Sequence, residues 1–276
     1  MNPILTVAAK ELRDGLRNRW IMAITLIFAL LSLGLAYFGA AAAGRVGFTS
    51  LDTTLISLAS LAIFIVPLIA LLLAYHTIVG EEEQGTLLLL LTYPLGRTQL
   101  LVGKFLGHAG IIAISSLLGF GIAGVVMALF STQSTPKELV GAYSYFILSV
   151  MLLGLVFVAF AHLISVIVNE KSRAAGLALL VWFLFVLIFD LVLLGLLVAT
   201  EGRIGAEIFP YLLLLNPTDI FRLANLASFE ATQVHAGLAT IAAPELLSPV
   251  FLLFALTLWI LLPFALACWL FSRRQA

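Results

Sequence analysis

The sequence has few groups placed for covalent chemistry. Its one Gly-Lys pair, Gly103-Lys104, is followed by Phe105 and has no glycine five residues before it. A phosphate-cradling P-loop is therefore not encoded here. No paired nucleophile and base are recognisable in the sequence either. We predict that the chain is not an enzyme and that any ATP and Mg²⁺ it depends on are bound by a partner subunit.

Metal ligands are scattered along the chain. The four histidines are His76, His108, His162 and His235, and the single cysteine is Cys268. No His pair at helical i, i+4 spacing and no Cys-x-x-Cys is present, which is the spacing that most metal sites need. We predict no bound metal or other cofactor, although His76 and His108 lie at similar depth, which leaves a cytoplasmic site open.

The densest patch of charge lies between two long apolar runs, in residues 80–104. Three glutamates precede five leucines, and acidic residues are favoured at a helix N-terminus by the macrodipole. Pro94 and Gly96 should end that helix. Because five leucines cannot span a bilayer, we expect a short helix that lies at the interface or docks into a protein groove. The residues concerned are Glu81, Glu82, Glu83, Gly85, Thr86, Leu87, Leu88, Pro94 and Arg97.

Asp190 stands alone in an apolar run, with the nearest charge far along the predicted helix. A carboxylate at such a place costs a few kcal/mol by insertion scales, so it marks either a functional site or a polar pairing. His162 is predicted at the other side of the membrane and is excluded as a partner. The sequence leaves both interpretations of Asp190 open, function or a hydrogen bond within the bundle.

The elements that position these groups are membrane helices. Hydrophobic residues make up 63% of the 276, charged residues 10%, and the mean hydropathy is +1.18. A soluble domain carries about a quarter charged residues. We predict an all-α integral membrane protein with a single permease domain over residues 1–276 and six spans, at residues 20–41, 55–78, 106–130, 143–168, 174–199 and 250–271.

The basic residues give the orientation. Ten of the 14 lysines and arginines fall in the set of loops that includes residues 1–19 and 80–104. By the positive-inside rule this set is cytoplasmic, and so are both termini. Residues 1–19 repeat apolar positions every four residues and predict an amphipathic helix on the membrane surface, in contact with lipid. Equal numbers of acidic and basic residues give no sign of a nucleic-acid partner.

Two further stretches stand out. The third span is rich in small residues, among them Gly103, Gly107 and Gly110, so it should pack closely against other helices. Residues 200–249 are predicted on the periplasmic side, where a short helix begins at Pro217. We predict docking of a periplasmic protein there, with Asn216, Pro217, Asp219 and Arg222 as candidate contacts.

The layout of residues 80–104, with the acidic triplet, Gly85-Thr86, the leucine run, Pro94, Arg97 and Gly103-Lys104, resembles the cytoplasmic loop of ABC-2 type transporter permeases, of the type V exporter kind. The resemblance implies a coupling helix between spans two and three that sits in a cleft of an ATP-hydrolysing subunit. Glu81, Glu82 and Glu83 would meet basic residues of that subunit, and the leucines would fill its cleft. A homodimer with two ATPase copies is also implied.

At the level of the whole chain, residues 1–14, the acidic loop and Asn216-Pro217-Thr218-Asp219-Ile220-Phe221-Arg222 are similar to permeases that serve maturation of the copper centres of nitrous oxide reductase in denitrifying bacteria. This implies the bacterial inner membrane and a periplasmic partner, with supply of copper or sulfur, or transmission of force, as the role. A generic ABC-2 exporter of a lipid, drug or glycan stays open as the alternative. No internal repeat supports a secondary transporter.

Overall fold

The computed structural model describes residues 2–17, 19–38, 51–130, 135–201, 208–227 and 248–274, and within them it contains helices and turns only, which confirms the all-α prediction. The helices are α1 (Pro3–Arg17), α2 (Trp20–Phe38), α3 (Leu51–Ala74), α4 (Val79–Glu83), α5 (Thr86–Leu91), α6 (Arg97–Phe130), α7 (Pro136–Ile167), α8 (Lys171–Phe183), the π-helix η2 (Leu184–Ile188), α9 (Phe189–Ala199), α10 (Phe209–Leu213), α11 (Pro217–Ala227) and α12 (Pro249–Arg273).

Among the described residues, five helical segments are long and apolar enough to cross a membrane: Thr53–Glu83, Arg97–Leu129, Lys137–Ile167, Lys171–Ala199 and Pro249–Arg273. They correspond to the second to sixth predicted spans. The first predicted span corresponds to α2, of which the described part, Trp20–Phe38, has 19 residues. Its predicted end at Ala41 lies outside the described residues, as do most of the residues between α11 and α12.

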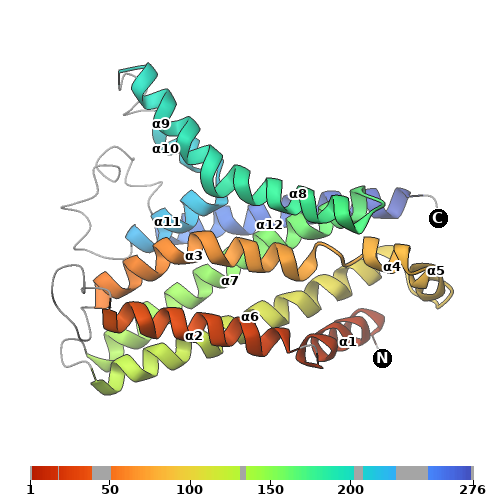
Figure 1. Ribbon diagram of the computed structural model, residues 1–276, viewed down its shortest axis with the longest axis horizontal. Helices are drawn as coiled ribbons and strands as arrows, with labels where there is room; N and C mark the ends of the chain where they lie inside the picture. Colours follow the sequence, from red (N-terminus) through yellow and green to blue (C-terminus); the bar gives the residue numbers. More distant parts are fainter. Residues whose placement is uncertain are drawn as a thin grey trace.

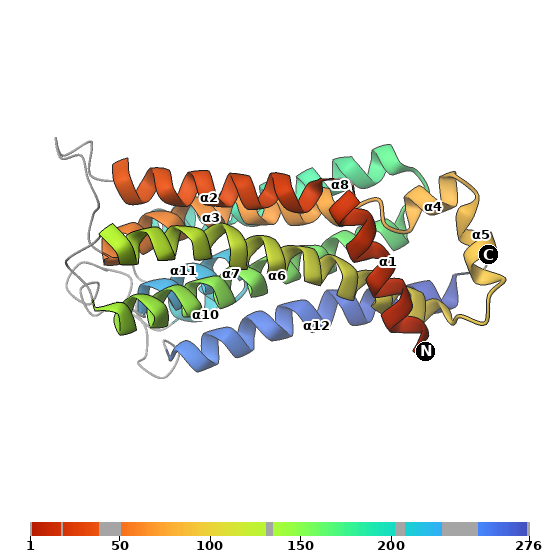
Figure 2. The ribbon, with the colours of Figure 1, turned by 90° about the horizontal axis from the view of Figure 1, so that it is seen from below.

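Helix α7 forms the centre of the bundle, and α3, α6 and α12 pack around it (Figures 1 and 2). Its side chains Val150, Leu153, Val156 and Phe157 are fully buried. The helix begins with a capping box, in which the Thr135 hydroxyl accepts from the Glu138 backbone N–H and the Glu138 carboxylate accepts from the Thr135 N–H. Helix α7 is therefore the element on which most of the other long helices pack.

Helix α6 begins at Arg97, well before the predicted start of the third span, so the polar turn around Lys104 belongs to the helix and not to a loop. The small residues do serve close packing, as predicted. Ideal Cβ atoms at Gly103 and Gly107 would lie 2.6 Å from Val7 Cβ and 2.4 Å from Glu11 Cβ, so this row of glycines seats α1 against α6. Figure 2 shows α1 lying across the first turns of α6.

The fifth predicted span is not one straight helix. Residues 184–188 form a π-helix between α8 and α9, and π-helical turns occur often at functional sites. Figure 1 shows that α9 turns away from the other helices, at the end of the molecule opposite α5. The bundle thus has two unusual regions, the segment α4–α5 at one end and the bent span at the other.

Candidate functional site

The predicted coupling helix is two short helices, α4 and α5, separated by Gly85. Gly85 has φ 70°, in the left-handed region that glycine adopts without strain. The glutamates therefore belong to α4, which corrects the prediction that they lie in the first turn of the leucine helix. Helix α5 ends at Leu91, shortly before Pro94, as predicted. We call residues 78–97 the coupling segment.

The start of α4 is held by the central helix of the bundle. The buried Ser165 hydroxyl, on α7, accepts hydrogen bonds from the backbone N–H groups of Ile78 and Val79 at 2.9 and 3.1 Å. These N–H groups are free at a helix N-terminus and need an acceptor. Ser165 thus caps α4 from a neighbouring helix and fixes where the coupling segment leaves the bundle.

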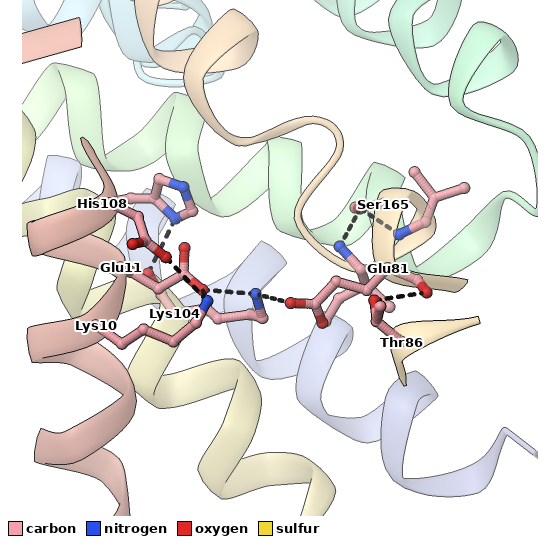
Figure 3. A network of polar contacts seen from close by, with 10 residues as sticks. Lys10, Glu11, Glu81, Thr86, Lys104, His108 and Ser165 are labelled. Carbon is pink, nitrogen blue, oxygen red and sulfur yellow. Dashed lines mark hydrogen bonds and ion pairs between the residues drawn. The ribbon is translucent and has the colours of Figure 1, made fainter. Parts of the chain in front are cut away.

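The side chain of Lys104 is the hub of the site (Figure 3). Its ammonium lies 2.7 Å from Glu11 Oε1 on α1 and 2.7 Å from Glu81 Oε1 on α4. The Lys104 side chain is only 4% exposed, so it is shielded from water. Such a buried cation is stable only while carboxylates accompany it. One buried charge therefore joins three elements: α1, α4 and α6.

Electrostatics hold Glu11 in its charged form. Burial alone would raise the pKa of Glu11, but the charge of Lys104 and its hydrogen bond outweigh burial and lower that pKa. Lys10 and Asp14 form a second, more exposed pair on the same helix at 3.1 Å. The backbone carbonyl of Lys104 lies 2.9 Å from His108 Nδ1, which adds a polar contact within α6.

The other two glutamates contact two further elements. Glu82 pairs with Arg274, which follows α12, at 3.1 Å. Glu83 Oε1 accepts from the Lys171 backbone N–H at 2.6 Å, so it caps the start of α8. Arg274 also donates to the Val166 carbonyl at the end of α7. The acidic triplet is thus tied within the chain to α6, to the end of α12 and to the start of α8.

The leucine run divides into a buried and an exposed side. Leu87 is buried in a small cluster with Ile78, Leu100 and Phe271. Leu88 and Leu89 are 61% and 64% exposed, and Tyr93 is exposed beside them. Of the five leucines, Leu87 therefore anchors the coupling segment, and Leu88 and Leu89 carry the apolar surface. Arg97 donates to the carbonyls of Phe271 and Arg274 and holds the end of the segment.

At the other end of the bundle, Asp190 has a partner that the sequence did not reveal. Arg222 Nη2 lies 2.8 Å from Asp190 Oδ2, and Arg222 Nη1 lies 2.6 Å from Asp219 Oδ1. Two groups predicted separately, the lone intramembrane carboxylate and the periplasmic candidates, thus form one cluster. Asp190 thus has a charged side-chain partner within the bundle, and its functional role stays a prediction.

Burial corrects part of the predicted docking surface. Asn216, Pro217 and Asp219 are buried, with Asp219 1% exposed. The Asn216 side chain donates to the Phe185 carbonyl at 2.9 Å and to Asp219 Oδ2 at 3.0 Å. These side chains hold α11 in the bundle and expose almost no surface to a docking protein. Arg222 is the one of the four candidates that is partly exposed.

Three of the four histidines, His76, His108 and His162, lie in the described part of the chain. The His108 and His162 rings meet edge to face with centroids 5.3 Å apart, and His76 makes an edge-to-face contact with Tyr75. In the part of the chain that the structure describes, no group of three or more His, Cys, Asp or Glu residues could hold a metal ion. His235 lies outside that part.

Sequence reasoning missed Glu11, Ser165 and the role of Lys104. Lys104 was counted among loop cations, yet it precedes the glycine row at Gly107 and Gly110 by the spacing of one helix turn. That row on one helix face indicates close approach of another helix. A basic residue on the same helix as such a row was the available signal that the cation is buried against a partner.

The comparisons with known proteins agree with this geometry. The profile of the ABC-2 family transporter proteins matches residues 5–276. The chain is 55% identical over 274 residues to the probable ABC transporter permease protein NosY of Stutzerimonas stutzeri, which covers 99% of both chains. It is also 55% identical, with the same coverage, to the protein of that name in Pseudomonas aeruginosa. The chain is thus a NosY-like, multi-pass permease subunit, and it belongs to the ABC-2 family of transporter proteins.

Proposed function

We propose that this permease couples ATP hydrolysis by a separate ATPase to a conformational change across the bacterial inner membrane, in support of copper-centre maturation in nitrous oxide reductase. The similarity to NosY proteins over the whole chain supports this assignment. It suggests a NosDFY-type complex with a homodimer of this chain, two NosF-like ATPases that bind ATP and Mg²⁺, and a NosD-like periplasmic protein. Helix α2 completes six spans, with both termini and the coupling segment in the cytoplasm.

The observation that carries the mechanism is the set of contacts made by the acidic triplet. Closure of an ATPase pair would displace α5 through Leu88, Leu89 and Tyr93, which are exposed for docking. Helix α4 is tied to α6 by Glu81, to the end of α12 by Glu82 and to the start of α8 by Glu83. A shift of the coupling segment would therefore reach three spans together. Packed helices change between discrete arrangements, so a small displacement can bias the whole bundle.

This mechanism assigns different tasks to the residues predicted to take part in coupling. Four residues keep the shape of the coupling segment: Gly85, Thr86, Leu87 and Arg97. Leu87 is buried, and Thr86 Oγ1 donates to the Glu81 carbonyl at 3.1 Å. Glu82 and Glu83 are the more accessible acids and remain candidates for contacts with basic residues of the ATPase. Pro94 follows α5 and prevents that helix from continuing. The cargo, if any crosses, is copper or a sulfur species; force transmission to the periplasmic partner requires neither.

Affinity purification of the tagged chain from its native host in mild detergent tests the proposal. Recovery of an ATPase together with a periplasmic protein is the expected result. An ATPase without a periplasmic protein would favour an ordinary exporter. If no ATPase is recovered from a chain that is folded and inserted, the coupling role of residues 78–97 is wrong.

A further inference from the structure

The bend between α8 and α9 is built around a single residue. The Phe185 side chain lies in an aromatic cluster, with ring centroids 5.3 Å from Phe160 and 5.6 Å from Trp259. Its carbonyl accepts two side-chain hydrogen bonds, from Asn216 Nδ2 at 2.9 Å and from Thr218 Oγ1 at 3.1 Å. A π-helical turn leaves backbone groups without regular partners, and α11 supplies them here. Phe185 is thus fixed at both its side chain and its backbone.

The helix before Phe185 is attached to the bundle. Trp182 Nε1 donates to the Phe64 carbonyl of α3 at 2.9 Å, and the start of α8 is capped by Glu83. Helix α11 is also fixed, because Ile220, Phe221 and Ala224 are fully buried and Asn225 Nδ2 donates to Ser149 of α7 at 3.0 Å. The pivot therefore lies between two stationary elements.

The helix after Phe185 is attached far less. Leu193 is the one buried residue of α9, which the structure describes in full, while Leu191, Val192, Leu194 and Val198 are 57% to 71% exposed. One turn beyond the bend, Asp190 pairs with Arg222 of α11. Asp190 also interacts with the neighbouring Asp219 carboxyl, so the polar contact that the structure gives between α9 and α11 is a cluster centred on the Arg222 guanidinium.

The environment of the pair is also informative. The side chains of Asp190 and Arg222 are 35% and 34% exposed. A charged pair is strongly disfavoured in contact with acyl chains. The exposed parts of the Asp190 and Arg222 side chains must therefore meet water or other polar groups. An ion pair in contact with water is weak and can open and close readily.

We propose that α9 is a hinged segment that pivots at Phe185 and is latched to α11 by the Asp190–Arg222 ion pair. Helix α9 extends from the bend toward the end of the molecule opposite α5 (Figure 1). The hinge does not depend on which ATPase or periplasmic protein binds the chain. Opening of the latch releases α9 from α11 while the pivot and α8 stay in place, so the two helices at this end change their separation without unfolding.

The structure also predicts that the two partners of the latch are not equivalent. In Asp190→Asn, Arg222 keeps its 2.6 Å pair with the buried Asp219, so α11 keeps its charge balance while α9 loses its ionic attachment to α11. In Arg222→Gln, Asp219 is left buried without its cation, so α11 is disturbed as well. Asp190→Asn is therefore the selective variant, and it is expected to fold and insert normally.

Pairs of spin labels in the full complex measure the hinge. One label at Val198→Cys on α9 and one at Val250→Cys at the start of α12, in a Cys268→Ala background, report the position of α9; both sites are exposed. Labelled chains are diluted with unlabelled copies so that each complex carries one pair. Labels at Leu179→Cys on α8 and Leu262→Cys on α12 serve as the reference pair.

We expect Asp190→Asn to broaden the Val198–Val250 distance distribution and shift it by several ångströms, with no change in the Leu179–Leu262 pair. Arg173→Gln, which removes an exposed ion pair with Glu170 at the start of α8, is the matched control and should alter neither pair. An unchanged Val198–Val250 distribution in Asp190→Asn would overturn the latch. Equal changes in both label pairs would overturn the hinge, because the whole span would then have loosened.

Discussion

The ammonium of Lys104 lies 2.7 Å from the carboxylate of Glu81, and this contact joins α6 to the coupling segment. The same ammonium contacts Glu11 of α1, so the N-terminal helix shares the junction. The site is therefore not a docking loop appended to a bundle. It is a buried polar junction through which the coupling segment, α1 and α6 have to move together.

Removal of the central cation should be damaging. In Lys104→Met, Glu11 and Glu81 would face each other without a counter-charge. Removing one partner of a buried ion pair costs about 3 kcal/mol of unfolding free energy. Thermal unfolding in detergent measures this as a lowered Tm. Lys10→Gln, which removes a more exposed cation on α1, should change the unfolding free energy by less than about 0.5 kcal/mol. Equal effects of the two variants would show that Lys104 is not the hub.

The seat of α1 on α6 depends on the absence of a Cβ atom. In Gly107→Ala the new methyl would lie 2.4 Å from Glu11 Cβ, which cannot move unless α1 moves. We expect a loss of about 1–3 kcal/mol in stability, together with separation of Glu11 from Lys104. Gly121→Ala on the same helix has nothing within 4 Å of the new Cβ and should be neutral or slightly stabilising. Thermal unfolding of the two variants side by side provides the comparison.

The two sides of α5 should respond differently to substitution. Leu87→Ala removes a buried side chain and should cost about 2–3 kcal/mol of stability, whereas Leu88→Ala should be almost silent. The double variant Leu88→Asp with Leu89→Asp should remain folded but lose the co-purifying ATPase. Lys137→Glu changes the net charge equally at an exposed position near the start of α7, and it should retain the ATPase. Retention of the ATPase by the double aspartate variant would place the docking surface elsewhere.

Acid should weaken the attachment of α1. Burial acts to raise the pKa of Glu11, but the charge and hydrogen bond of Lys104 lower it below the ordinary value of a glutamate, so the ionised form is favoured in the folded state. A group with a lowered folded pKa contributes stability above its unfolded pKa, and this is lost as the pH falls through the folded value. The stability difference between the parent chain and Glu11→Gln should therefore be constant near neutral pH and shrink below about pH 4.5. A difference that grows with acidity would contradict this pairing.

Most of the helices could be predicted from the sequence, because runs of apolar residues of spanning length leave little choice of structure in lipid. The end of α5 before Pro94 followed from local chemistry in the same way. The split of the coupling segment at Gly85 was missed, since glutamates are good helix formers and the acidic residues were expected at the N-terminus of one short helix.

The polar contacts were harder to predict because they join segments that are distant in the sequence. Asp190 and Arg222 are separated by 32 residues, and the predicted membrane boundary placed them in different environments. Glu11 and Lys104 are 93 residues apart. Hydropathy gives the depth of a charged residue in the membrane but not its neighbour. The sequence therefore predicts each charged residue by itself, Asp190 as an isolated intramembrane carboxylate and Lys104 as a loop cation. The glycine row was the one local signal that two helices meet there.

Photo-crosslinking from the coupling segment tests the central claim most directly. A photoreactive phenylalanine analogue at Tyr93, an exposed position beside Leu89, is incorporated into the full-length chain in its native host and activated in intact membranes. We expect a covalent adduct with an ATPase subunit, reduced by the Leu88→Asp and Leu89→Asp substitutions and retained in Lys137→Glu. Adducts formed with lipid or with the chain itself, and none with an ATPase, would contradict the assignment of residues 78–97 as the coupling segment.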